Sequence, residues 1–452
     1  MNRSARKARK DLSADSLFRL IRSRFDDLPD ARAGVPEISL GDALMSAFAM
    51  FSLKDPSLLA FDKRRHDPND NFRTLYGIQR VACDTQLRTI LDPFSPDPLR
   101  PLFHDVFRRL QRGKALERFV YLDGHYLLSL DGTTYFSSSK VHCPACLEKR
   151  HRGGGVTYSH QLLGATLVHP DLKEVIPLAP EPIVNQDGHT KNDCERNATR
   201  RWLKKFRQDH PHLPVIVIED ALSANAPHLD DLGEARAHYI IGVKPGDHAF
   251  LFEHLRADDE AGQTQTLTLD DSATGVLHHF RIHHGVSLNE SHPDCLVNVL
   301  EYWEIHPPKI VKKVERVGKL QYFSWITDFA LTQDNVEAIM RGGRARWKIE
   351  NETFNTLKNQ GYNFEHNYGH GEQNLSVVLA MLMMLVFLVD QSQQLSCPLF
   401  QAAWKKQGHN KRSLWEAMRN LFESFVFASM QELYEAMVSG IARQPPVLLN
   451  SS

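Results

Sequence analysis

The run Pro-Val-Ile-Val-Ile at residues 214–218 constrains the fold of this chain more than any other feature. It is apolar over five consecutive residues and is followed at once by two acidic residues, which is typical of a strand buried on both faces. Charged helical patterns precede it at 193–210 and follow it at 229–237, and a second apolar strand lies at 238–244. Strands that alternate with helices in this way predict an α/β core.

Four further strand-like segments are predicted before this alternation begins. The segments 119–122 and 126–130 flank Asp123-Gly124, a residue pair that favours a tight hairpin turn. Two more strand-like segments follow, at 160–170 and 174–183. A meander of strands that leads into alternating helices and strands predicts a mixed sheet.

Helical and β-rich segments lie on either side of this core. The first hundred residues are predicted to be helical, with a helix capped by Ser39 and another that begins at Asp84. The apolar run Leu375–Val389 is shorter than the ~18–20 residues that span a bilayer, so we expect a buried helix. The chain is therefore divided into a helical N-terminal region, the first part of the core, a β-rich insertion, the rest of the core and a helical C-terminal region, at 1–118, 119–262, 263–331, 332–391 and 392–452.

Charge and cysteine content limit the partners and the compartment. Lysine plus arginine number 54 and aspartate plus glutamate number 55, so the net charge favours no class of partner. The first ten residues hold five basic side chains and no acid, which indicates either a nucleic-acid-binding arm or a solvated terminus. No secretion signal is visible, and six cysteines scattered over 452 residues do not resemble a disulfide framework. We therefore expect a cytoplasmic protein with no membrane partner.

Three acidic residues are predicted to meet at one edge of the sheet. Asp131 follows the strand 126–130 and Asp220 follows the strand 214–218, so both lie where ligands bind in open α/β sheets. The segment 344–360 is predicted to be one helix, and it carries Glu350 on its packed face. Three carboxylates at one spot repel one another unless a cation lies between them, and carboxylate oxygens suit Mg²⁺ or Mn²⁺.

These motifs resemble those of a known enzyme family. SLDGTTYF, VIEDAL and GRARWKIEN…LK, with QDGHTKNDCERNATRRWL and YNFEHNYGHGEQNLS, are similar to the signature regions of insertion-sequence DDE transposases. The similarity is to the insertion-sequence-four-type branch, which has a ribonuclease-H-like core, a β insertion before the last acidic residue and a Y-R-E-K signature. It covers 119–389 and implies this fold for the chain.

The resemblance implies roles for individual residues. Asp131, Asp220 and Glu350 match the catalytic triad, which implies a site for two Mg²⁺ or Mn²⁺ ions. Arg346 matches the arginine of the signature and implies a contact with a DNA phosphate, and its basic neighbours Arg344 and Lys348 are further candidates for DNA binding.

Two positions depart from the signature. The expected tyrosine is Gly343, and the lysine at 358 lies one residue beyond its usual place, which Leu357 occupies. Lys358 is therefore the weakest of the four DNA-binding candidates.

The implied activity is cleavage of DNA at the ends of a mobile element, followed by attack of the freed 3′-hydroxyl on target DNA. The implied partners are double-stranded element ends and target DNA, bound by a homodimer in a synaptic complex on the bacterial nucleoid. Two other functions remain open: a transposase-derived DNA-binding protein without cleavage, and a generic ribonuclease-H-like nuclease.

Single residues also have alternative roles. Arg346 and Glu350 fit an ordinary surface ion pair, and Asp123 fits a turn residue better than a catalytic one.

Cysteine and histidine motifs raise a separate possibility. Cys143 and Cys146 have the two-residue gap of a zinc knuckle, with His142 and His151 near them and Cys194 farther along the chain. A second short-spaced pair is missing, so a structural zinc ion and a pair of reduced thiols both remain open. The histidine-rich segment 278–285 alternates like a strand and is not expected to bind metal. The basic run 309–320 fits either a phosphate contact or a solvated strand edge.

Overall fold

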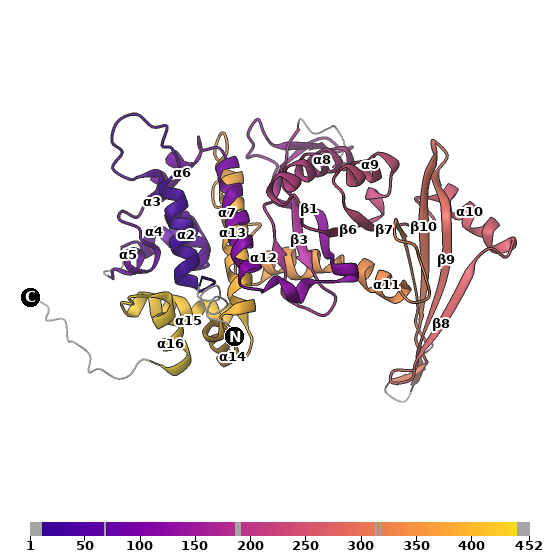
Figure 1. Ribbon diagram of the computed structural model, residues 1–452. Helices are drawn as coiled ribbons and strands as arrows, with labels where there is room; N and C mark the ends of the chain where they lie inside the picture. The colour runs from indigo at the N-terminus through magenta and orange to yellow at the C-terminus, as the bar shows by residue number, and fades with distance from the viewer. Residues whose placement is uncertain (1–10, 67–68, 186–190, 312–313, 317, 441–452) are drawn as a thin grey trace, which may run out of the picture.

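The computed structural model describes residues 11–66, 69–185, 191–311, 314–316 and 318–440, without the side chains of 191–194 and 309–317. The basic segment 1–10 lies outside the described residues, and so does the side chain of Cys194. The molecule is elongated, with a helical body, a central α/β core and a projecting extension of the sheet in a row (Figure 1).

The core is built on one mixed sheet. The described residues form eleven strands in this sheet, in the order β2-β3-β1-β6-β7-β13-β10-β9-β8, with β4 and β5 also paired to β3. β1 runs antiparallel to β3 and parallel to β6, which is parallel to β7. The core strands are β1 (Tyr126–Ser138), β2 (Leu147–Arg150), β3 (Val156–Val168), β4 (Ile176–Pro177), β5 (Glu181–Ile183), β6 (Val215–Glu219) and β7 (His238–Gly242). An antiparallel meander followed by two parallel strands beside β1 confirms the expected ribonuclease-H-like fold.

Helices cover this sheet as the sequence predicts. α8 packs against β3 and β5, and α11 packs against β6, β7 and β10. All five residues of β6 are buried, as expected of a strand covered on both faces. The core helices are α8 (Lys191–Asp209), α9 (Ala226–Glu234), α10 (Ala249–Glu260), α11 (Val336–Arg344) and α12 (Asn355–Asn359).

The β-rich region after α10 continues the core sheet. β13 pairs antiparallel with β7, with Trp325 opposite Gly242, and carries β10, β9 and β8 outward in turn. These long strands project beyond the core (Figure 1). They are β8 (Gln265–Asp271), β9 (Val276–Asn289), β10 (His292–Ile305) and β13 (Leu320–Thr327), with a small hairpin of β11 (Lys309–Val311) and β12 (Val314–Arg316). The segments that sequence marked as β-like are therefore strands.

Helices from both ends of the chain share one helical body. α13 (Leu375–Ser396) is long and apolar enough to cross a membrane, but 89% of its apolar window is buried inside the protein. It packs against α2, α3, α6, α7 and α14, so the predicted buried helix is confirmed. The expected boundary at 391/392 falls within it. The other helices of the body are α2 (Ala14–Asp26), α3 (Leu40–Ser52), α4 (Leu58–Arg64), α5 (Asn71–Tyr76), α6 (Asp84–Leu91), α7 (Arg100–Arg112), α14 (Pro398–Lys406), α15 (Lys411–Ser424) and α16 (Met430–Ser439).

Local predictions fare unevenly. The hydroxyl of Ser39 accepts the backbone N–H of Asp42 at 3.0 Å and caps α3 as predicted. The segment 119–122 is not the strand that the sequence predicts: Val120 forms an isolated bridge to Tyr126, and no strand extends from it. The predicted turn itself is present, with Asp123 at φ 51° and Gly124 at φ 78°.

Candidate active site

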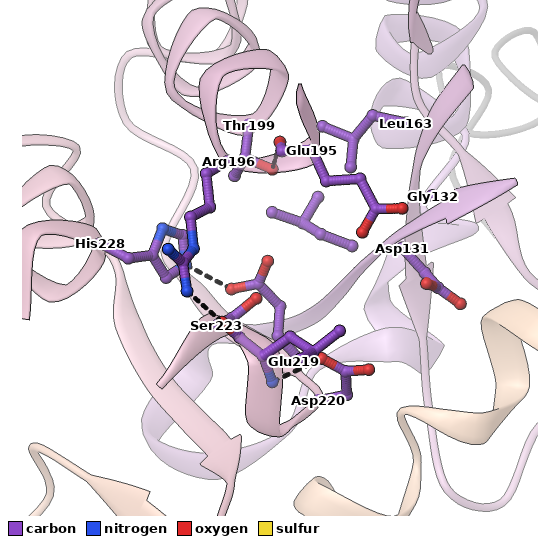
Figure 2. Close-up of a pocket in the computed structure, with 12 residues that line it drawn as sticks. Asp131, Gly132, Leu163, Glu195, Arg196, Thr199, Glu219, Asp220, Ser223 and His228 are labelled. Atoms are coloured by element: carbon purple, nitrogen blue, oxygen red, sulfur yellow. Dashed lines mark hydrogen bonds and ion pairs between the residues drawn. The ribbon is translucent and has the colours of Figure 1, made fainter. Parts of the chain in front are cut away.

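Asp131 and Asp220 lie at the same edge of the sheet. β1 and β6 pair in parallel only as far as Ser129 and Ile218, and Asp220 follows β6 directly. The sequence suggests that the strand ends just before Asp131, but β1 continues to Ser138 through its antiparallel pairing with β3. Asp131 lies two residues beyond the last β6 pair, where the carboxyl end of β6 leaves room for side chains (Figure 2).

Asp220 is held by the backbone that follows it. Its carboxylate accepts the backbone N–H of Leu222 at 3.0 Å and caps the short 3₁₀ turn Ala221–Ser223. Capping fixes the side chain beside the pocket instead of leaving it free to rotate.

The segment that carries Glu350 is not one regular helix, which corrects the prediction for 344–360. α11 ends at Arg344, and a π-helical turn at Ile349–Phe354 precedes α12. In this turn the backbone N–H of Asn355 donates to the carbonyl oxygen of Glu350. π-helical turns are rare and are frequent at functional sites.

Phe354 fixes this turn against the sheet. A Cβ atom on Gly164 of β3 would lie 2.7 Å from Cζ of Phe354, so the ring fits only because residue 164 is a glycine. Gly164 pairs directly with Asp131 across β1 and β3. The aromatic contact therefore holds the Glu350 turn over the strand position that carries Asp131.

Arg346 joins the two carboxylates. Its Nη1 lies 2.8 Å from Oε1 of Glu350 and 4.0 Å from Oδ2 of Asp131, and its side chain is only 11% exposed. The hydroxyl of Ser129 donates to its backbone carbonyl at 3.3 Å. The guanidinium therefore places a positive charge between the two acidic groups. An ordinary solvated ion pair on the surface would join Arg346 to Glu350 alone.

The pKa of Asp131 reflects the other charged groups near it. This pKa is raised to about 7, chiefly by burial and also by the negative charges of Glu350, Asp220 and Glu195, while Arg346 opposes the rise. Asp131 therefore shares a pocket with Asp220 and shares the guanidinium of Arg346 with Glu350. Hard oxygen donors that repel one another in a half-buried site fit a divalent cation such as Mg²⁺ or Mn²⁺.

Sequence reasoning missed a fourth carboxylate in the pocket. Glu195 of α8 lines one pocket together with Asp131 and Asp220 (Figure 2). A Cβ atom on Gly132 would lie 2.6 Å from its Oε1, so this glycine gives the glutamate its place. Nothing in the charged pattern of α8 separates Glu195 from the ordinary solvated acids of a helix.

A buried acid–base pair supports the floor of the same pocket. Nε2 of His228 lies 2.5 Å from Oε2 of Glu219, and both side chains are buried. Burial lowers the pKa of His228, but the charge and hydrogen bond of Glu219 outweigh burial, so the pKa is raised overall. Glu219 thus favours the protonated form of His228, which would balance the Glu219 charge beside the neighbouring Asp220.

The other three DNA-binding candidates have partners within the protein. Arg344 pairs with Glu304 of β10 and lies over the ring of Phe323. Nζ of Lys348 donates to the carbonyl oxygen of Leu172 at 2.6 Å. Nζ of Lys358 lies 2.8 Å from Oε1 of Glu365, which is 61% exposed.

The two departures from the signature have structural reasons. A Cβ atom on Gly343 would lie 2.6 Å from Cε2 of Trp325, so the indole of β13 occupies the space that a tyrosine would need. Leu357 is fully buried, which excludes a charged lysine at that position unless it is paired. Lys358 is the adjacent, partly exposed residue.

The cysteine motif forms part of a cluster that can hold a metal ion. Cys143 and Cys146 lie with two histidines, His160 and His370, that the sequence reasoning did not connect to them. His142 instead stacks on Tyr158 with ring centroids 4.4 Å apart. His151, the other expected neighbour, is exposed and contacts the hydroxyl of Thr157 at 2.7 Å.

Comparison with known proteins gives one family match. The family model of the transposase DDE domain matches residues 175–388, a range that includes Asp220 and Glu350 and begins after Asp131. A search of curated proteins finds no match. Among solved structures, a cryo-EM structure of the piggyBac transposase synaptic complex with hairpin DNA is similar at 10% identity and a TM-score of 0.34, covering 98% of this chain and 86% of that one. The family finding is thus a match of residues 175–388, a little under half of the chain, to the transposase DDE domain.

Proposed function

We propose that the protein is a transposase that cleaves the ends of a mobile DNA element and joins them to target DNA in a divalent-metal-dependent reaction. The observation that carries this proposal is the placement of three carboxylates from separate elements: Asp131 and Asp220 line one pocket, and Arg346 lies between Asp131 and Glu350. The match of 175–388 to the transposase DDE domain supports the same reaction class.

The three carboxylates would hold two Mg²⁺ or Mn²⁺ ions. When bound, such ions activate the nucleophile and stabilise the leaving oxygen of a phosphoryl displacement. The raised pKa of Asp131 supports this role, because a bound cation relieves the repulsion and burial that oppose its ionisation. Arg346 compensates part of the same charge, and on DNA binding its guanidinium is free to pair with a phosphate beside the scissile bond.

Two displacements at phosphorus account for the whole reaction. In the first, water attacks a phosphate at the element end, a P–O bond to water oxygen forms, and the bond to the 3′ oxygen breaks. The released 3′-hydroxyl is the nucleophile of the second, in which it bonds to a target phosphate and displaces that strand's own 3′ oxygen. One set of carboxylates serves both steps in this proposal.

We further propose that the protein binds double-stranded element ends and target DNA as a homodimer, in the bacterial cytoplasm. Partly exposed basic residues around the Glu350 segment are the proposed phosphate contacts, and the helical body is the proposed end-binding region. DNA phosphates would replace the acidic or carbonyl partners that these side chains now have. The residues are Arg344, Arg346, Lys348 and Lys358.

The test is nicking of a labelled duplex that carries the element's terminal sequence. We expect the wild-type protein to bind this duplex in Mg²⁺, Mn²⁺ or Ca²⁺, and to nick it only in Mg²⁺ or Mn²⁺. Binding without nicking in any of these ions would reject the transposase proposal and favour a DNA-binding protein without cleavage. Nicking of unrelated duplexes at the same rate would favour a generic nuclease.

A further inference from the structure

Four buried side chains from distant parts of the sequence converge beside the core sheet. Cys143 and Cys146 lie in the loop after β1, His160 lies in β3, and His370 lies in the loop before α13. All four are buried, and their ligand atoms lie within 4.8 Å of one another. His160 and His370 are more than two hundred residues apart in the sequence, so local structure alone does not explain why both lie beside the two thiols.

The distances between these atoms fit a single tetrahedral ion. Metal–sulfur bonds of ~2.3 Å and metal–nitrogen bonds of ~2.0 Å place the ligand atoms of a tetrahedral site ~3.3–3.8 Å apart. The two Sγ atoms lie 3.9 Å apart and the two Nε2 atoms 3.2 Å apart. Nε2 of His160 lies 3.4 Å from Sγ of Cys143 and 3.5 Å from Sγ of Cys146, and Nε2 of His370 lies 3.3 Å from Sγ of Cys146. Cys and His ligand atoms are therefore already spaced as in a zinc site.

Neighbouring groups orient the ligands toward the centre. Nδ1 of His370 lies 2.9 Å from the carbonyl oxygen of Gly371, which can only accept, so Nδ1 carries the proton and Nε2 presents its lone pair. The backbone N–H of Cys146 donates to the carbonyl oxygen of Cys143 at 3.1 Å, and this turn places both thiols on one side. Orientation of a ligand by a second hydrogen bond is typical of metal-binding histidines.

We propose that Cys143, Cys146, His160 and His370 bind one structural zinc ion. Two thiolates and two imidazoles in tetrahedral arrangement favour zinc among the common metals, and a closed set of four protein ligands is typical of structural sites. The site is separate from the carboxylate pocket and takes a different class of metal. The zinc proposal does not depend on whether the protein cleaves DNA.

The proposed zinc ion would fasten together the segments that flank the catalytic carboxylates. β3 carries both His160 and Gly164, the glycine that receives Phe354 of the Glu350 turn. His370 follows that turn in the chain, and its loop is also tied to the helical body, because Asp92 accepts the backbone N–H groups of Glu372 and Gln373 at 2.9 and 3.0 Å. Zinc would therefore tie the loop before α13 to β3 of the core.

Metal content of the purified full-length protein tests the site directly. We expect about one zinc per chain after expression in zinc-supplemented medium and desalting. Cobalt exchanged into the wild-type protein should give the intense visible absorption of a tetrahedral thiolate site. Removal of the zinc with a chelator should lower the melting temperature by about 5 °C or more.

Matched variants assign the ligands. Cys143→Ser and His370→Gln should each lose most of the bound zinc, whereas Cys295→Ser and His142→Gln, outside the cluster, should keep it. Asp131→Asn should also keep it, which separates this site from the proposed magnesium site. Should the ligand variants fail to fold, zinc content and cobalt absorption of the wild type still decide the question.

Three results would overturn the proposal. One is wild-type protein with less than about 0.2 zinc per chain and no tetrahedral cobalt spectrum. Another is full zinc content in Cys143→Ser or His370→Gln. The third is a Cys143–Cys146 disulfide in freshly purified protein, detected as two missing thiols among the six cysteines, since oxidised sulfurs do not ligate zinc.

Discussion

At the scale of single residues, the sequence identifies Asp123 as a turn residue. Asp123 stands before a glycine between strand-like segments, and the structure gives it a left-handed turn conformation with an exposed side chain. Asp131 could be assigned only together with Asp220 and Glu350, because an aspartate after a strand has many uses. Glu195 could not be assigned at all, since its place in the pocket depends on how α8 packs against Gly132.

The shifted titration of Asp131 predicts a pH-dependent stability. Its pKa in the folded protein, about 7, lies above the ordinary value of 3.8, so the folded state binds a proton that the unfolded state has released. The stability that this proton contributes is complete below pH 3.8 and is lost as the pH rises toward and past 7. The loss is at most on the order of 4 kcal/mol.

Urea denaturation between pH 4 and 8 in chelator measures this effect. The free energy of unfolding of the wild type should fall relative to that of Asp131→Asn as the pH rises. Mg²⁺ added at pH 8 should recover part of the loss in the wild type only. A difference between the two proteins that stays constant with pH would contradict the assignment.

At the scale of elements, the strands and most helices could be predicted because their apolar patterns are local. The Glu350 segment shows where local pattern fails. Its periodicity favours one helix over 344–360, but Gly342 and Gly343 let α11 lie close against Ile240 and Trp325, and the chain then needs a wider turn to seat Phe354 on β3. The wider turn results from packing against the sheet, so the sequence of the segment alone does not predict it.

Substitution of Gly164 tests how this turn is positioned. Gly164→Ala places a methyl group where the Phe354 ring lies, so the π-helical turn must shift and carry Glu350 away from Asp131. We expect nicking to fall about tenfold or more while end binding remains, because small misplacements of catalytic groups are costly. Gly233→Ala in α9 is the control, since a Cβ atom there meets nothing within 4 Å. Unchanged nicking by Gly164→Ala would show that this contact does not position Glu350.

At the scale of the whole molecule, long-range pairings are the part that sequence does not reveal. The extension of the core sheet through β13 and β7, and the meeting of two cysteines with His160 and His370, both depend on the completed fold. The helical body also depends on a long-range contact. Lys54, just after α3, is buried with its Nζ 2.7 Å from Asp390 of α13 and 4.2 Å from the centre of the Trp415 ring of α15. This buried ion pair thus connects the N-terminal helices to the C-terminal helices of the body.

Removal of that lysine charge should destabilise the helical body. Lys54→Met leaves Asp390 largely buried without its cation, at a cost of about 3–5 kcal/mol in the free energy of unfolding by urea. The double variant with Asp390→Asn should recover part of this cost. Arg80→Ala, which breaks the exposed pair with Glu37, is the control and should change stability by less than about 0.5 kcal/mol. A Lys54→Met protein as stable as the wild type would refute this role.

The most direct measurement of the central claim is the nicking rate of triad variants on a labelled element end in Mg²⁺. Asp131→Asn, Asp220→Asn and Glu350→Gln each remove one negative charge and keep the shape of the side chain. Each should bind the end duplex as the wild type does and nick it about a thousandfold more slowly or worse, with no further loss when variants are combined. Asp123→Asn, in the turn, and Glu352→Gln, in the π-helical turn, are the matched controls and should nick at the wild-type rate. Normal nicking by any triad variant, or loss of nicking in Asp123→Asn with full activity in Asp131→Asn, would contradict the assigned site.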